Sequence, residues 1–159
     1  MTDLPPLEIA RRIPRLREEL AAEGCDALVV SDLDNIRCLT GFTGSNATVL
    51  VTGERTTFVT AGVEADIVIG NDAGPALKAA ARGITRIGLE ADAVAWATQR
   101  RWSVETFAWA HLVPTEGVVL GLRAVKDDGE VARLREASRI ADAALADVRH
   151  RLDDGITEA

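Results

Sequence analysis

The segment from Asp34 to Asn46 holds the residues of this sequence that are best placed to do chemistry. It reads Asp-Asn-Ile-Arg-Cys-Leu-Thr-Gly-Phe-Thr-Gly-Ser-Asn, with two glycines around a Phe-Thr pair and small hydrogen-bonding residues after them. One interpretation is a polar loop displayed at the edge of a sheet, with Arg37 as a fixed cation. The other is a structural connection between a helix and a strand, in which Phe42 packs into the core.

Elsewhere the sequence predicts no catalytic residue and no metal ligand. His111 and His150 lie in no metal-ligand spacing, and the two cysteines are too far apart for a zinc knuckle. Neither Ser31 nor Ser45 lies in a nucleophile-elbow sequence. Phosphate-binding Walker loops and dinucleotide-binding fingerprints are also absent from the sequence.

Asp32 and Asp34 follow a short apolar run at the position where ligands collect in open α/β sheets. A receiver domain would also need acids on neighbouring strand ends and a lysine at a strand end, and no such lysine occurs. We therefore reject a receiver domain and interpret both residues as exposed acids.

The composition indicates an ordinary globular domain. The chain has 159 residues, is 47% hydrophobic and 27% charged, and carries a net charge of -7. That charge repels phosphate backbones and anionic lipid surfaces, so we expect no nucleic-acid and no membrane partner. No uncharged apolar run reaches the ~18 residues of a membrane helix, and charged residues interrupt the N-terminal region, so a cytoplasmic protein is expected.

The order of apolar patterns and turn residues predicts an α/β fold, a mixed sheet flanked by helices. We expect a helix over 7–23, a buried strand over 27–30 and a short helix over 35–39, with Asp34 as its N-cap and Gly41 at its end. A hairpin is expected over 47–60. After it, the pattern predicts strands over 66–69, 86–89 and 107–113, and helices over 72–82 and 93–104.

The last part of the chain predicts one long helix. Asp127 and Glu130 form a capping box at its start. An apolar stripe follows at helical spacing, which should pack on a partner surface: Val131, Leu134, Ala137, Ala141, Leu145, Val148 and Leu152. Gly155–Glu158 then resembles the start of another helix, so we expect the chain to be the front part of a longer protein.

Two motifs resemble the N-terminal domain of the creatinase, prolidase and aminopeptidase P family. The segment Asn35–Asn46 is similar to the family signature Asn-Ile-Arg-Tyr-Leu-Thr-Gly-Phe-Thr-Gly-Ser-Asn, and 121–137 is similar to the junction into the family's catalytic domain. Gly155–Glu158 resembles the end of the first catalytic-domain helix. The resemblance implies a ribonuclease H-like N-terminal domain over 1–122, followed by the junction and the first, long helix of a truncated catalytic domain over 123–159.

The resemblance also implies a function. Family members are two-domain metallopeptidases that cleave the bond before proline, with two divalent metals, often manganese or cobalt, bound by two Asp, one His and two Glu. These ligands belong to the catalytic domain, so this chain should hold no metal and be inactive alone. Expected partners are its own C-terminal catalytic domain, a second copy in a homodimer, and proline-containing peptides. The alternative is a non-catalytic peptide- or protein-binding module that retains the fold.

By the same resemblance, one loop should reach the partner subunit's catalytic pocket. It is preceded by Arg37 and consists of Phe42, Thr43, Gly44, Ser45 and Asn46. Arg37 would pair with a substrate carboxylate through a forked contact, or else form a local ion pair with Asp32 or Asp34.

The sequence departs from the family pattern at two points. Cys38 stands where the family commonly has Tyr. After Thr60 the family usually continues with Asp-Gly-Arg-Tyr and a helix, whereas Ala61 follows here at once. Because a missing helix would expose apolar strand surface, we interpret this as a stretch omitted from the sequence.

Overall fold

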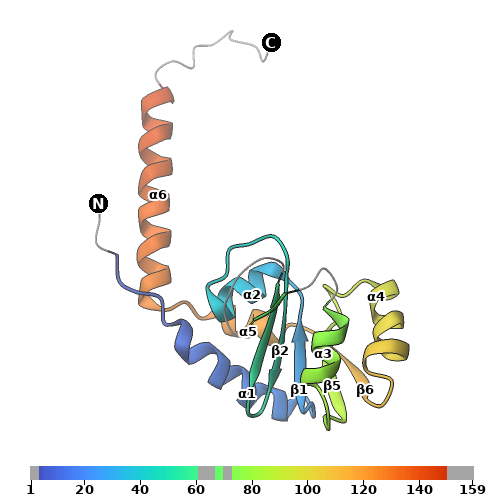
Figure 1. Cartoon of the computed structure of the whole chain (residues 1–159). Helices are drawn as coiled ribbons and strands as arrows, with labels where there is room; N and C mark the ends of the chain where they lie inside the picture. Colours follow the sequence, from blue (N-terminus) through green and yellow to red (C-terminus); the bar gives the residue numbers. More distant parts are fainter. Residues whose placement is uncertain (1–3, 61–66, 70–72, 150–159) are drawn as a thin grey trace, which may run out of the picture. The chain divides into compact units, whose positions relative to one another are not determined.

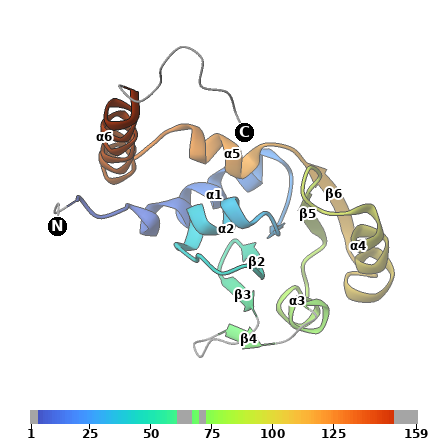
Figure 2. The same ribbon diagram turned by 90° about the horizontal axis from the view of Figure 1, so that it is seen from above.

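The computed structural model describes residues 4–60, 67–69 and 73–149. Its centre is a mixed sheet in the order β4-β3-β2-β1-β5-β6, whose strands are labelled between Figure 1 and Figure 2. The strands are β1 (Ala27–Val30), β2 (Ala47–Thr52), β3 (Thr56–Thr60), β4 (Ile67–Ile69), β5 (Arg86–Glu90) and β6 (His111–Thr115). β1 pairs antiparallel with β2 and parallel with β5, so it joins an antiparallel part of the sheet to a parallel part.

The helices are α1 (Arg12–Ala22), α2 (Leu33–Thr40), α3 (Gly74–Ala80), α4 (Trp96–Arg101), α5 (Val118–Ala124) and α6 (Asp128–Arg149). A single 3-10 turn (Ile9–Arg11) precedes α1, and a π-helical turn (Trp102–Thr106) continues α4. None of the helices in the described ranges is long and apolar enough to cross a membrane.

Alternation along the strands divides the core into two layers. Leu28 and Val30 of β1 belong to a cluster built with α1, α2 and α5, while Ala27 and Val29 belong to a second cluster built with α3 and the π-helical turn. Figure 2 shows α1, α2 and α5 on one side of the sheet and α3 and α4 on the other. All four residues are fully buried, as expected of a strand covered on both faces. The predicted α/β fold, with a mixed sheet flanked by helices and a long helix at the end, is confirmed.

Most predicted elements are present, and two need correction. The strand over 27–30 and the hairpin over 47–60 are confirmed. The N-cap of α2 is Asp32, not Asp34, because the helix begins directly after the end of β1. The predicted strand over 107–113 is wrong in its first half: β6 begins at His111, and the buried Phe107 closes the π-helical turn by donating its N–H to the Trp102 carbonyl.

Some predictions concern residues outside the described ranges. These are the connection from Thr60 to Ala61, the start of the helix over 72–82, the histidine at position 150, the stripe residue Leu152 and the segment Gly155–Glu158. The described strand β4 and helix α3 lie within the strand and helix predicted there.

The chain divides into two compact units, one spanning Ile9–Val125 and the other combining Met1–Glu8 with Lys126–Ala159. The predicted boundary after residue 122 therefore stays a prediction. In the second unit, the capping box is confirmed: the Glu130 N–H donates to Asp127 Oδ1 at 2.8 Å and the Asp127 N–H to Glu130 Oε2 at 3.1 Å.

The start of α6 also holds the N-terminal segment. Arg133 Nη1 donates to the Pro5 carbonyl at 2.6 Å, and the Pro6 carbonyl lies so close to Gly129 that a Cβ there would overlap it. The large apolar residues exposed further along α6 are Leu134, Leu145 and Val148 of the predicted stripe, and Ile140 beside it. The partner surface for the stripe stays a prediction.

Asp26, directly before β1, links the start of β1 to the start of β5 by hydrogen bonds. Its Oδ2 accepts the Arg86 N–H and the Thr85 hydroxyl, both at 2.9 Å, and the Thr85 N–H at 3.3 Å. These hydrogen bonds, first that of the Thr85 side chain, lower the pKa of Asp26 from its ordinary value of 3.8.

We expect Asp26→Asn to reduce the free energy of unfolding at pH 7 by about 1 kcal/mol or less, since the side chain is exposed and solvent screens its charge. A carboxyl with a lowered folded pKa stabilises the protein above its unfolded pKa and loses this contribution as pH falls through the folded value. The difference between variant and wild type should therefore shrink below about pH 4 in urea titrations. A pH-independent difference would contradict this role.

Candidate functional site

Helix α2 presents one face to the core and one to solvent. Asp32 caps it by accepting the Asn35 N–H at 2.8 Å, and Ile36, Cys38 and Leu39 are buried. The helix ends at Gly41, whose φ of +76° is the left-handed conformation that favours glycine. Arg37 lies on the opposite, exposed face, in the last turn.

The loop after α2 is anchored at both ends. The half-buried Phe42 ring packs edge-to-face against Phe58, with ring centroids 5.0 Å apart. At the far end, the Thr60 hydroxyl donates to the Asn46 carbonyl at 2.6 Å. The remaining candidate residues, Thr43, Gly44, Ser45 and Asn46, are exposed. Phe42 thus packs inward, as expected of a structural connection between helix and strand, while residues 43–46 are exposed, as expected of a loop that binds a ligand.

Arg37 has no ion pair within residues 4–60, 67–69 and 73–149. The two acids considered as its local partners are otherwise engaged: Asp32 caps α2, and Asp34 lies 3.8 Å from Arg123 Nη2. The local ion pair is therefore not formed, and the cation is available to a ligand.

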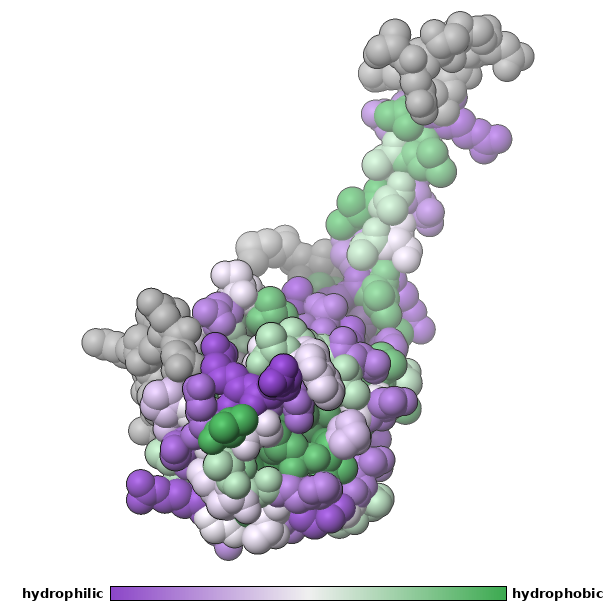
Figure 3. Space-filling view, turned by 90° about the vertical axis from the view of Figure 1, so that its right-hand side faces the viewer, coloured by the Kyte–Doolittle hydropathy of each residue, from purple (hydrophilic) through white to green (hydrophobic). Residues whose placement is uncertain are grey.

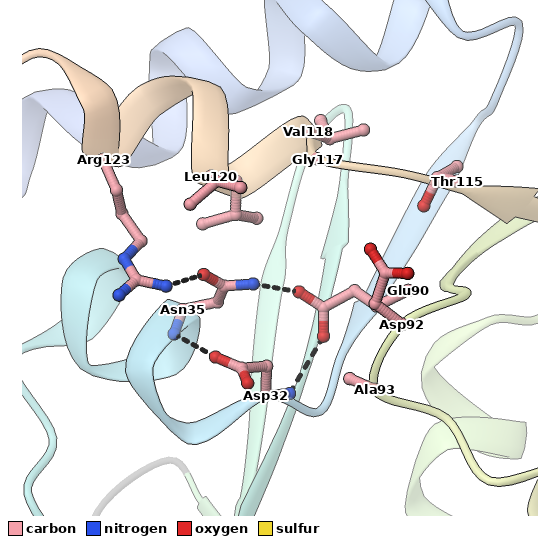
Figure 4. A pocket seen from close by; sticks show the side chains of 11 residues that line it. Asp32, Asn35, Glu90, Asp92, Ala93, Thr115, Gly117, Val118, Leu120 and Arg123 are labelled. Atoms are coloured by element: carbon pink, nitrogen blue, oxygen red, sulfur yellow. Dashed lines mark hydrogen bonds between the residues drawn. The ribbon is translucent and has the colours of Figure 1, made fainter.

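A second polar cluster lies at the carboxyl ends of the parallel strands β1, β5 and β6. There Asp32, Asn35, Glu90 and Arg123 line a cavity of about 180 Å³ (Figure 4). The strand order runs outward from β1 to β4 and then continues at β5 on the other side of β1, and open α/β sheets collect ligands where the strand order reverses in this way.

Glu90 is the centre of this cluster and is only 8% exposed. Its Oε2 accepts the N–H groups of Ser31 at 2.7 Å and Asp32 at 2.9 Å, and its Oε1 accepts Asn35 Nδ2 at 2.7 Å. Arg123 Nη1 donates to Asn35 Oδ1 at 2.8 Å. The carboxylate therefore joins the start of α2 to β5 and, through Asn35, to α5.

Sequence reasoning did not identify Glu90, and it included Asn35 and Arg123 only as members of the two family motifs. The available signal was an acid directly after the predicted strand over 86–89, beside the strand end that carries Asp32. No group of three or more His, Cys, Asp or Glu in the described part of the chain is arranged to hold a metal ion. The acids Asp32 and Glu90 of this cavity instead accept backbone and amide donors.

Both cysteines, Cys25 and Cys38, are buried and form no disulfide, and burial raises the pKa of the Cys25 thiol, which disfavours its thiolate. Cys38, where the family commonly has Tyr, lies under Arg12, whose Nη1 donates to the Cys38 carbonyl at 2.7 Å.

A third feature is an apolar groove of about 430 Å³ between α4 and β6, lined by Val94, Trp96, Leu112 and Pro114 among others. Figure 3 looks onto this side of the molecule and shows hydrophobic side chains among strongly hydrophilic ones. Trp96 is 74% exposed at the groove. The lining is mainly apolar and also includes Gln99 and Glu90, the latter shared with the polar cavity.

Comparison with known proteins relates this chain to one family. The sequence model of the creatinase/prolidase N-terminal domain matches residues 12–125. An uncharacterized peptidase, YqhT of Bacillus subtilis, is 29% identical over 160 residues, which cover 92% of this chain and 45% of that protein.

Solved structures agree. An Xaa-Pro dipeptidase from Bacillus anthracis matches with a TM-score of 0.82 and 26% identity, over 95% of this chain and 46% of that one. The N-terminal domain of the cytoplasmic peptidase PepQ from Mycobacterium tuberculosis matches with a TM-score of 0.64 and 30% identity, over 71% of this chain and 98% of that one. This chain thus spans about half the length of the longer relatives.

The loop geometry gives a test at Gly44, where a Cβ would lie inside the contact distance of three atoms of the Phe42 ring. Gly44→Ala should displace the ring from Phe58 and lower the free energy of unfolding by about 1–3 kcal/mol, as overpacking does. Gly53→Ala is the matched control, because nothing lies within 4 Å of its Cβ position. Equal unfolding midpoints for the two variants would show that the Phe42 contact does not hold the loop.

Proposed function

The chain belongs to the creatinase/prolidase N-terminal domain family, and from this premise we propose that it is the N-terminal domain of a metal-dependent Xaa-Pro aminopeptidase or dipeptidase. The names of its relatives support this proposal, since an Xaa-Pro dipeptidase and a cytoplasmic peptidase share the fold at 26% and 30% identity. In the proposed division of roles, this domain orients and admits the peptide while another part of the protein carries the hydrolytic centre. A cytoplasmic location is part of the same proposal.

We place the metal ligands outside these 159 residues. Within the described ranges no group of three or more His, Cys, Asp or Glu is arranged to hold a metal ion, and two of the acids that line the polar cavity, Asp32 and Glu90, already accept hydrogen bonds from the protein. Manganese or cobalt, bound in the catalytic half, would polarise the scissile carbonyl and generate a nucleophile from water. The 45% and 46% coverage of the longer relatives supports a catalytic half of about the same size as this chain.

The observation that carries the proposed role of this domain is the exposed Arg37 beside an anchored loop. The guanidinium has no ion pair in the described structure, and Gly41, Phe42 and Asn46 fix the loop next to it. A guanidinium matches a carboxylate with two parallel hydrogen bonds. We therefore assign Arg37 to the carboxylate of a proline-containing peptide bound in the catalytic pocket of the partner subunit of a homodimer.

Activity should depend on the sequence that follows Ala159. The 159-residue chain with Mn²⁺ should leave an Xaa-Pro peptide intact, whereas the protein encoded with its downstream region should hydrolyse it, as followed by proline release. Hydrolysis by the short chain would overturn the proposed division of roles. Binding of the peptide without hydrolysis by the extended protein would favour the non-catalytic binding module.

Arg37→Ala in the extended protein should raise KM about 10- to 100-fold for a peptide with a free carboxylate, corresponding to about 1.5–3 kcal/mol for a charge-assisted hydrogen bond. Arg37→Lys should recover only part of this loss, because an ammonium lacks the forked geometry. Arg100→Ala, at an exposed position of α4, is the control and should leave KM unchanged. An unchanged KM for Arg37→Ala would remove Arg37 from the substrate pocket.

A further inference from the structure

We propose that Glu90 is a positioning residue, which holds the start of α2 in one orientation and thereby sets the direction in which α2 presents Arg37 and the loop over 42–46. Its effect on a substrate rests on the proposed function. The Glu90 carboxylate forms no hydrogen bond with Arg37 or with the loop. Its hydrogen bonds are to residues at the start of α2, so it acts on Arg37 and the loop through the helix.

Several donors from one short stretch of chain meet the buried Glu90 carboxylate. Two backbone N–H groups, of Ser31 and Asp32, share Oε2, and the Asn35 amide takes Oε1. These donors lie in the turn that leads from β1 into α2 and in its first turn. Glu90 itself is the last residue of β5 and lies in register with Thr115 of β6, so its backbone is held by the sheet. The carboxylate thus fastens the start of α2 to a fixed point.

The hydrogen bonds of this network have only one possible direction. A guanidinium can only donate and an ionised carboxylate can only accept, so the Asn35 amide must turn its oxygen to Arg123 and its nitrogen to Glu90. If the Asn35 amide were flipped, its nitrogen would face the donor Arg123 and its oxygen would face the acceptor Glu90. Asn35 therefore has one orientation, and α2 is joined to β5 and to α5 at the same time.

Because α2 is short, we expect a displacement of its first turn to displace its last turn as well. α2 has eight residues, about 12 Å of rise, and is packed on the core through Ile36 and Leu39. Asn35 and Arg37 are two residues apart and so lie on nearly opposite faces. A rotation or shift at the Asn35 end is consequently carried to Arg37 by the helix as a whole, and a displacement near 1 Å can cost about 100-fold in rate.

A compensating pair of substitutions tests this role. Glu90→Gln alone leaves an amide nitrogen facing the Asn35 amide or the backbone donors, and Asn35→Asp alone places a second carboxylate against Glu90. When both are combined, the new glutamine can donate its nitrogen to the new aspartate and accept the Ser31 and Asp32 N–H groups with its oxygen. The new aspartate can still accept from Arg123.

In the extended enzyme, each single variant should lower kcat/KM about tenfold, mainly through KM, and the double variant should return to within about threefold of wild type. Val59→Ala, in the core layer away from α2, is the control for a general loss of stability. It should leave kcat/KM unchanged at a temperature where the protein is folded. Additive effects in the double variant, or single variants no worse than this control, would overturn the proposal.

A second measurement separates this inference from the proposed function. Amide hydrogen exchange in the 159-residue chain reports on the Ser31 and Asp32 N–H groups without any substrate. Their protection should fall about tenfold in each single variant and recover in the double variant, while Val59→Ala should change it less. If Arg37→Ala leaves KM unchanged but this pattern is seen, the proposed substrate contact fails and the positioning of α2 stands. Unchanged protection in the single variants would overturn the positioning role.

Discussion

Strand β1 ends at the buried Val30, and the backbone N–H groups of the next two residues, Ser31 and Asp32, take their hydrogen-bond acceptor from the protein. Val30 is fully buried, and the next two residues donate to a carboxylate of the neighbouring strand. A carboxylate suits this position because it offers two acceptor oxygens and no donor. Asn35 and Arg123 extend the same contact to α2 and α5. These hydrogen bonds of Glu90 set the orientation of α2, and with it the direction of Arg37 and of the loop over 42–46 at the other end of the helix.

Much of the fold could be predicted because β1 and the hairpin carry strong local signals. Four consecutive apolar residues indicate a strand covered on both faces, and a Gly-Glu turn between β-branched arms indicates a hairpin. Phe107 lies beyond the reach of such signals. A buried aromatic residue before a strand has the same local pattern as the strand itself, and only its packing against Trp102, with ring centroids 6.1 Å apart, distinguishes the two.

The candidate site could be predicted in part for the same reason. The loop over 42–46 is encoded locally, by Gly41 at the end of the helix and by the small residues after Phe42. Glu90 and Arg123 lie 55 and 88 residues from Asn35, so no window of sequence contains their network. The choice of Asp32 over Asp34 as N-cap likewise depends on where β1 ends, which the capping preference alone cannot decide.

The edge strand β6 bears on how this domain can associate. Its register with β5 places His111, Val113 and Thr115 in the ladder and turns the backbone of Leu112 and Pro114 outward. Proline brings no amide hydrogen to that rim, so another β-strand approaching it would leave one of its own carbonyls unanswered. The missing donor at Pro114 therefore disfavours extension of the sheet by a further strand along β6.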